Sequence, residues 1–206
     1  MTDVMLYGPK PSTYVRTCRL ALAEKGVDYG LVETMPNSDE QFAHHPFGKV
    51  PGFSHGAVEL FETLAICQYV DETFDGPGLQ PADTADRARM TQWCSAYIDY
   101  LYPTLVRGIV IQRVVVPMRG GQTDEALVAA AAETGAGHMK VVDKLLGDST
   151  YLAGPAPTIA DYLLVPALTY LDKLPEARLI TDNANVQDWF ARMTDRPSYA
   201  AAGLAD

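Results

Sequence analysis

The sequence predicts an α/β domain with the element order βαβαββα, followed by an all-helical domain. Strand and helix signals alternate over residues 1–75, whereas the apolar patterns that follow have helical spacing. Between them lies Asp75-Gly76-Pro77-Gly78-Leu79-Gln80-Pro81, a stretch rich in turn residues. We therefore predict a first domain at residues 1–75, a linker at 76–82 and a helical domain at 83–206. The length of 206 residues and the apolar content of 48% suit a soluble protein with one large or two small cores.

The first domain begins with a short apolar strand at residues 4–7, which the turn Gly8-Pro9-Lys10-Pro11 ends. Apolar residues then recur at helical spacing as far as the stop signal Lys25-Gly26, and a second strand covers 29–33. A strand–helix–strand unit of this length implies parallel strands with a right-handed crossover. A short helix at 39–44, a hairpin turning at His55-Gly56 and a helix that carries residues 65–74 complete the domain.

The second domain contains four helical patterns, at residues 83–116, 124–146, 159–170 and 186–194. Pro117 ends the first of them. Thr158 and Asp161 have the spacing of a helix cap, in which the hydroxyl and the carboxylate each bind a free backbone N–H group. We assign this pair to folding and not to chemistry.

Charge and cysteine content exclude several kinds of partner. The formal net charge of −10 argues against nucleic acid and against anionic membranes, both of which attract clustered Lys and Arg. No apolar run approaches the roughly 18 residues of a membrane span, and the start lacks a secretory signal. The three cysteines are widely spaced and odd in number. We therefore expect no metal site and no disulfide, but reduced thiols in a cytoplasmic protein.

Two dipeptides suggest a site for a peptide-like ligand. Val50-Pro51 precedes the hairpin, and a strand beside a proline can offer its backbone N–H and C=O to a guest peptide. A cis bond at this proline would turn the backbone of Val50 outward, although most proline bonds are trans. Glu62-Thr63 stands at a helix start, where free N–H groups bind a carboxylate and the acid binds an ammonium group. Both dipeptides also have a purely structural interpretation, as a strand-initiating trans proline and a helix cap.

Ser12 stands at the predicted N-terminus of the first helix. Its hydroxyl fits a helix cap, and it equally fits a hydrogen-bond donor to a thiolate. A free thiol has a pKa near 8.5, so lowering it by about 2 units requires roughly 2.7 kcal/mol of thiolate stabilisation. One charge-assisted hydrogen bond together with the helix dipole supplies this amount.

In their order and spacing, these motifs resemble those of cytosolic glutathione S-transferases over essentially the whole chain. The matching segments are Tyr7-Gly8-Pro9-Lys10-Pro11-Ser12 with Val15-Arg16, His45-Pro46-Phe47-Gly48-Lys49-Val50-Pro51, Phe61-Glu62-Thr63-Leu64-Ala65-Ile66 and Pro157-Thr158-Ile159-Ala160-Asp161. The resemblance implies a thioredoxin-like first domain, a helical second domain and a homodimer.

The resemblance also assigns roles to individual residues. Ser12 falls on the catalytic serine of plant phi-type and related bacterial members, and Val50-Pro51 falls on their cis-proline step. Glu62 and Thr63 fall on the pair that holds the γ-glutamyl group, although threonine replaces the usual serine. Lys49 falls on a side chain that helps to hold the peptide.

Some assignments stay open. Tyr7, Thr13 and Tyr14 compete with Ser12 as thiolate donor, and Tyr7 lies near the catalytic tyrosine of animal-type members. The chain looks shorter than phi-type members between Glu33 and His45, and their His-Lys pair for the glycine carboxylate has no clear match. The substitutes are His44, His45 or Lys49.

The first helix of the second domain is expected to line a pocket for the electrophile. Trp93, Tyr97, Tyr100 and Leu101 recur there at helical spacing. We assign Trp93 to the core and Tyr97 and Tyr100 to the pocket, because tyrosine lines sites with an apolar body and a polar tip.

The function that the resemblance implies is conjugation of the glutathione thiolate to a small hydrophobic electrophile. Glutathione is then a co-substrate, and no cofactor or metal is expected. Two alternatives remain. One is another glutathione-dependent enzyme with this fold, such as a dehalogenase, an isomerase or a peroxidase. The other is a non-catalytic ligand-binding or stress protein.

Overall fold

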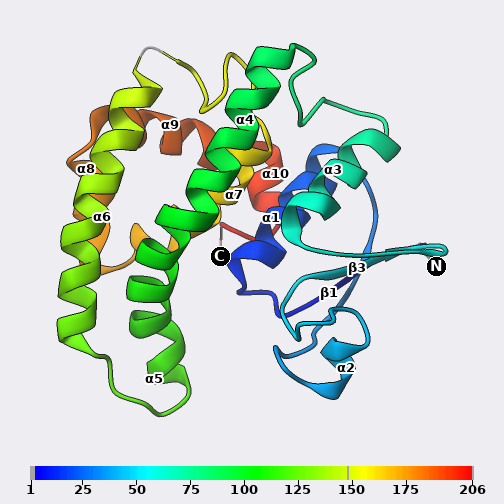
Figure 1. Ribbon diagram of the computed structural model, residues 1–206, viewed down its shortest axis with the longest axis horizontal. Helices are drawn as coiled ribbons and strands as arrows, with labels where there is room; N and C mark the ends of the chain where they lie inside the picture. The colour runs from blue at the N-terminus through cyan, green and yellow to red at the C-terminus, as the bar shows by residue number, and fades with distance from the viewer. Residues whose placement is uncertain (1–2, 148, 206) are drawn as a thin grey trace. The chain divides into compact units, whose positions relative to one another are not determined.

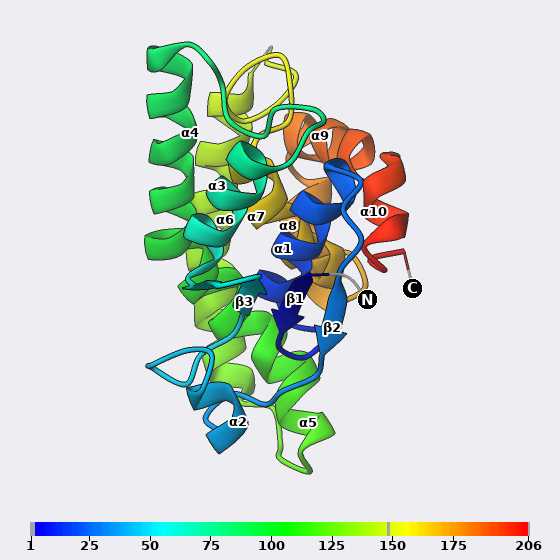
Figure 2. The same cartoon turned by 90° about the vertical axis from the view of Figure 1, so that its right-hand side faces the viewer.

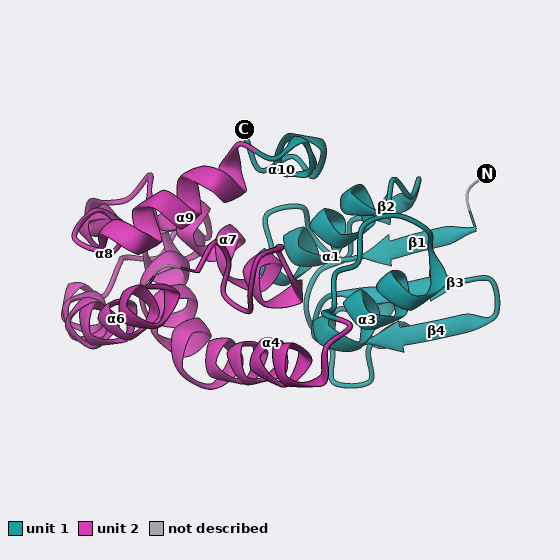
Figure 3. Ribbon diagram, turned by 90° about the horizontal axis from the view of Figure 1, so that it is seen from above, with its two compact units in different colours: residues 1–81, 196–206 teal, residues 82–195 magenta. Residues whose placement is uncertain are grey.

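The computed structural model describes residues 3–147 and 149–205, which form two compact units. Figure 3 colours them separately: residues 1–81 with 196–206, and residues 82–195. The first unit has the order β1 (Val4–Tyr7), α1 (Thr13–Glu24), β2 (Gly30–Val32), α2 (Asp39–Phe42), β3 (Gly52–His55), β4 (Val58–Phe61) and α3 (Thr63–Thr73). The predicted order βαβαββα is therefore confirmed.

The four strands form one sheet in the order β2-β1-β3-β4. β1 and β2 are parallel, as predicted, while β3 is antiparallel to both β1 and β4. Helix α1 packs against α3, and in both Figure 1 and Figure 2 the short helix α2 lies apart from these two. The core of this unit is apolar; fully buried members include Leu6, Val15, Leu22, Phe53 and Ile66.

The sheet topology brings three chain segments to one edge. Because β1 and β4 both run opposite to β3, the ends of β1 and β4 lie beside the start of β3. The register pairs Tyr7 with Gly52 and Gly52 with Phe61. Gly8 follows β1, Glu62 follows β4 and Pro51 precedes β3, so these three residues lie close together. We call this part of the sheet the site edge.

Among its described residues, helices make up the second unit, apart from its loops and an isolated β-bridge between Tyr151 and Gly154. Its elements are α4 (Thr84–Ala96), η1 (Tyr97–Val115), α5 (Val116–Met118), α6 (Glu125–Leu146), α7 (Ile159–Leu171), η2 (Pro175–Ala177), α8 (Arg178–Thr181) and α9 (Ala184–Thr194). The predicted segment at 83–116 divides into α4 and η1. Helix η1 has wider turns, and at its end the Val116 N–H donates to the carbonyl of Ile111, five residues back. It also contains Pro103, which has no N–H to donate.

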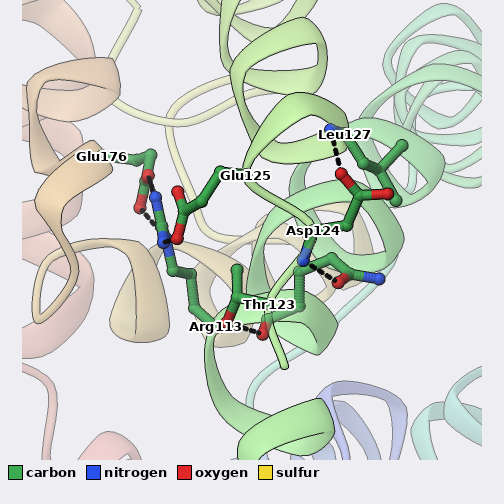
Figure 4. A network of polar contacts seen from close by, with 7 residues as sticks. Arg113, Thr123, Asp124, Glu125, Leu127 and Glu176 are labelled. Atoms are coloured by element: carbon green, nitrogen blue, oxygen red, sulfur yellow. Dashed lines mark hydrogen bonds and ion pairs between the residues drawn. The ribbon is translucent and has the colours of Figure 1, made fainter. Parts of the chain in front are cut away.

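An ion-pair network joins three parts of this unit (Figure 4). The Arg113 guanidinium donates to Glu176 at 2.8 and 3.1 Å and to Glu125 at 2.6 Å, linking η1 with η2 and α6. The hydrogen bonds that Arg113 donates to Glu176 and, second, to Glu125 raise the pKa of Arg113. Asp124 begins α6 by accepting the Leu127 N–H at 3.0 Å.

The predicted cap at Thr158 and Asp161 is present and buried. The Asp161 carboxylate accepts the Thr158 N–H at 2.8 Å, the Leu152 N–H at 3.0 Å and the Trp189 indole N–H at 2.8 Å. This carboxylate thus fixes the start of α7 to a preceding loop and to α9.

The C-terminal segment differs from the expected division of the chain. Residues 196–206 belong to the first unit, although we had placed them in the helical domain. Arg196 donates to both carboxylate oxygens of Glu24 at 2.8 Å, and α10 (Pro197–Ala201) packs against α1. Among the described residues, no helix is both long enough and apolar enough to cross a membrane.

Candidate active site

The turn after β1 contacts the residue before the proline at the site edge. Gly8 has a φ of +143°, and a Cβ atom placed there would lie 2.6 Å from Val15 Cγ2 and 3.1 Å from Val50 Cβ. Both values are too short for ordinary contacts, so only glycine fits. The close approach places the backbone that leads to Ser12 against Val50.

Ser12 occupies the N-cap position of α1. Its half-buried hydroxyl accepts the Val15 N–H at 3.4 Å, a long hydrogen bond. Because the hydroxyl acts as an acceptor there, its proton remains available to a ligand. The first turn of α1 carries no acidic residue, so no carboxylate of that turn offsets the positive potential of the helix N-terminus.

The competing hydroxyls have different surroundings. The Tyr7 hydroxyl lies 3.3 Å from Ser54 Oγ, and its ring stacks on His44 with the ring centroids 3.5 Å apart. Thr13 is buried, with 5% of its surface exposed. Ser12 is thus more accessible than Thr13 and is not held by another side chain as Tyr7 is. Tyr14 is half-buried and remains an alternative.

The Val50–Pro51 peptide bond is cis, as predicted. Val50 is half-buried and Lys49 is exposed. The carbonyl of Lys49 accepts a 2.5 Å hydrogen bond from the side-chain amide of Gln41, and the oxygen of that amide accepts the Thr34 hydroxyl. Neither Gln41 nor Thr34 belongs to a periodic pattern, so no sequence signal pointed to these two residues.

Glu62 stands directly before α3 in an unusual backbone conformation. Its φ is 71° and its ψ is 119°, a region that residues other than glycine rarely adopt. Although it occupies the N-cap position, its side chain makes no capping hydrogen bond, and the side chain is 67% exposed. Thr63, which we had considered as a possible cap, is instead the first residue of the helix and is buried. The carboxylate of Glu62 is therefore available to a ligand.

His45 lies beneath this carboxylate. It is 2% exposed, and its Nε2 lies 3.8 Å from Glu62 Oε1. Its Nδ1 accepts the Phe47 N–H at 3.3 Å, so a neutral ring carries its proton on Nε2, toward Glu62. Burial lowers the pKa of His45, while the nearby Glu62 carboxylate opposes that shift. The sequence analysis had considered His45 only as a substitute ligand for the glycine carboxylate.

The two tyrosines assigned to the electrophile pocket differ in exposure. Tyr97 is 1% exposed and its ring lies 6.0 Å from that of Tyr102. Tyr100 is 61% exposed, with its ring 6.2 Å from that of His138. Tyr100 therefore presents surface to a ligand, whereas Tyr97 packs in the interior. Trp93 is 8% exposed, which agrees with its assignment to the core.

Comparison with known proteins supports this description of the fold. The sequence-family model of the glutathione S-transferase N-terminal domain matches residues 6–78, and the family model of the C-terminal domain matches residues 94–197. A glutathione S-transferase of Hyoscyamus muticus is 32% identical over 204 residues, covering 96% of both chains. The structure of glutathione S-transferase III in its apo form has a TM-score of 0.90 and 31% identity, covering 99% of this chain and 97% of that one.

A second structure is that of glutathione S-transferase I from maize in complex with an atrazine glutathione conjugate. It has a TM-score of 0.88 and 29% identity, and the alignment covers 98% of each chain. With family models matched in both halves, the chain belongs to the glutathione S-transferase family.

Proposed function

We propose that this transferase binds glutathione along the site edge and activates its thiol there. The γ-glutamyl ammonium pairs with Glu62, and the γ-glutamyl carboxylate accepts N–H groups at the start of α3, where Thr63 stands. The cysteinyl backbone pairs with Val50. Ser12 donates to the thiolate, and the exposed Lys49 reaches the glycine carboxylate.

The observation that carries this proposal is the exposed carboxylate of Glu62 at a helix start. The Glu62 side chain makes no hydrogen bond to the free N–H groups of its own helix, so the carboxylate and those N–H groups are both open to a ligand. An ammonium beside a carboxylate is the polar pattern of an amino-acid head group. The free N–H groups and the acid match those two charges.

The chemistry then requires few further groups. The thiolate sulfur forms a bond to an electrophilic carbon, and the leaving group departs with the electron pair of the broken bond. Ser12 and the N-terminus of α1 stabilise the thiolate, and the site holds the reactants in position. We propose Tyr100, with its exposed ring, as a contact of a hydrophobic electrophile.

The wider setting follows from the same family. We propose a homodimer, which the exposed aromatic pair Phe47 and Phe61 supports, since their rings lie 6.3 Å apart on the surface of the protein. A cytoplasmic location is supported by the three buried cysteines, none of which forms a disulfide. A glutathione-dependent dehalogenase, isomerase or peroxidase activity is the alternative, and turnover of hydroperoxides would identify the peroxidase.

The head-group assignment is tested with Glu62→Ala. The variant leaves the bound ammonium without its partner. Titration calorimetry should therefore show that the free energy of glutathione binding is weaker by about 1.5–3 kcal/mol. Glu59→Ala, which removes an exposed carboxylate from β4, is the matched control and should bind as the wild type does. Equal affinity in Glu62→Ala and wild type would refute the assignment. Turnover with aryl halides, epoxides, isothiocyanates and hydroperoxides then identifies the electrophile class.

A further inference from the structure

Gln41 has a buried side chain that the proposed chemistry does not use. It lies in α2 and is 0% exposed. Its Nε2 donates to the Lys49 carbonyl at 2.5 Å, and its Oε1 accepts the hydroxyl of Thr34, which is 1% exposed. Because a carbonyl only accepts hydrogen bonds, the NH₂ group must face Lys49, and this fixes the orientation of the amide.

The bond to Lys49 determines the direction of a neighbouring donor. The carbonyl of Lys49 and the N–H of Val50 belong to one peptide unit, which is planar and trans. In a trans unit these two groups point in opposite directions. A side chain that holds the carbonyl on one side therefore aims the Val50 N–H toward the other side.

We propose that Gln41 is a positioning residue for the glutathione backbone, acting through the peptide unit between Lys49 and Val50. This inference rests on the proposed function, in which Val50 pairs with the cysteinyl backbone. Gln41 does not touch the ligand. It restricts the rotation of one peptide unit, so that the Val50 donor is already oriented when the ligand arrives.

Other contacts hold the surrounding loop without Gln41. The Asn37 N–H donates to the Gly48 carbonyl at 2.8 Å, and the Gly48 N–H donates to the His45 carbonyl at 2.8 Å. The Gln41 N–H itself bonds to Ser38 Oγ at 3.1 Å, which a substitution of the side chain leaves in place. Loss of the Gln41 amide should therefore free one peptide unit and leave the loop folded.

The test uses Gln41→Leu, which keeps the volume and removes both side-chain hydrogen bonds. Its affinity is measured for glutathione and for the thiol-free analogue γ-glutamyl-2-aminobutyryl-glycine. Both dissociation constants should rise by about threefold to tenfold, the factor for one hydrogen bond. KM for glutathione should rise, while kcat at saturation and the pKa of the bound thiol stay near wild type.

Asn183→Leu is the matched control. Asn183 is also buried, and its amide donates to the Leu179 carbonyl at 2.9 Å, but it lies in the helical unit. The Asn183→Leu variant should be less stable than wild type but should bind glutathione with the same affinity. Equal affinity of Gln41→Leu and wild type, or an equal loss in Asn183→Leu, would overturn the proposal. Thr34→Val removes only the hydroxyl that donates to Gln41 Oε1, so it should weaken glutathione binding less than Gln41→Leu does. If Gln41→Leu does not fold, Thr34→Val tests the proposal in its place, and wild-type affinity in that variant would overturn it.

A second measurement separates this inference from the proposed function. In the wild type, the Val50 amide resonance should shift when the thiol-free analogue binds. Binding without that shift would reject the Val50 contact itself, whatever Gln41 does. A shift at Val50 combined with unchanged affinity in Gln41→Leu would reject only the role of Gln41.

Discussion

Replacement of Ser12 by alanine tests how the thiol is activated. In the structure the Ser12 N–H donates to the Pro9 carbonyl at 3.0 Å, and the Ser12 carbonyl accepts the Arg16 N–H at 2.9 Å. Alanine keeps both backbone bonds, so the turn and the start of α1 should persist. The variant loses the hydroxyl proton proposed for the thiolate and the 3.4 Å bond from Val15.

The two losses have separate magnitudes. A hydrogen bond to a charged group contributes about 1.5–3 kcal/mol, so the thiol pKa of bound glutathione should rise by about 1–2 units. Losing a helix cap costs about 0.5–2 kcal/mol of folding free energy, and the long bond from Val15 places Ser12 at the lower end of that range. The N-terminus of α1 stays free of acid and still favours the thiolate. The pKa should therefore remain below that of free glutathione.

The assay is the ultraviolet absorbance of the thiolate in the binary complex, followed against pH. Asp83→Ala is the control for a lost cap, because Asp83 caps α4 through the N–H groups of Ala85 and Asp86. It should lower stability and leave the thiol pKa unchanged. The affinity of Ser12→Ala for glutathione should change little, because the head-group and backbone contacts remain.

If the thiol pKa and the turnover of Ser12→Ala equal those of wild type, Ser12 is not the donor. A rise in Tyr7→Phe instead would assign the role to Tyr7, even though its hydroxyl lies 3.3 Å from Ser54 Oγ. Tyr14→Phe and Thr13→Val test the remaining hydroxyls in the same way. A wild-type complex with an ordinary thiol pKa would refute thiolate stabilisation altogether and would favour the ligand-binding alternative.

Two further predictions concern stability. Burial depresses the pKa of His45, so the unfolded chain binds a proton at this residue more readily than the folded chain does. The contribution of neutral His45 to the free energy of unfolding should therefore be complete above about pH 6.5. It should be lost as the pH falls from there through the lower pKa of the folded state. Urea unfolding between about pH 5 and 8 should show a shallower decline in His45→Asn, and parallel curves for the two proteins would contradict this. Asp161→Asn should cost about 3 kcal/mol, because a buried carboxylate loses charge-assisted bonds from the Thr158 and Trp189 N–H groups. Asp83→Ala, at an exposed cap, should cost less folding free energy than Asp161→Asn in the same unfolding assay, and equal losses would refute the importance of burial.

Local sequence patterns predicted the elements that position the site. Turn residues at Gly8-Pro9 and at His55-Gly56 divide the first unit into strands and helices, and the structure confirms that order. The prediction that Val50–Pro51 is cis came from family resemblance and not from the residues alone, since most proline bonds are trans. The family resemblance thus predicted a peptide-bond isomer that the local sequence pattern did not predict.

Long-range contacts were not predictable in this way. Gln41 reaches Lys49 only once the loop between α2 and β3 has folded, and a single glutamine in a four-residue helix has no periodic signal. The pairing of Glu24 with Arg196 links residues at opposite ends of the chain, so no local pattern indicated that the C-terminal segment groups with the first unit. Tyr97 and Tyr100 share the pattern of one helix, but their different burial depends on the packing around them.

The distribution of charge explains how an acidic protein attracts an anion. Glutathione carries two carboxylates and one ammonium at neutral pH, and ionisation of its thiol adds a further negative charge. The chain has a net charge of −10, so its long-range field opposes this ligand. Helices α4, α6 and α7 carry an acid in the first turn, but α1 and α3 do not. Because β1 and β4 end at the same edge, the starts of α1 and α3 both lie there, with Glu62 at the N-cap of α3 and no acid in the first turn of either helix, so their free N–H groups supply positive potential locally. Within the first unit, strand topology thus places the two favourable helix termini where the proposed thiolate and γ-glutamyl carboxylate require them.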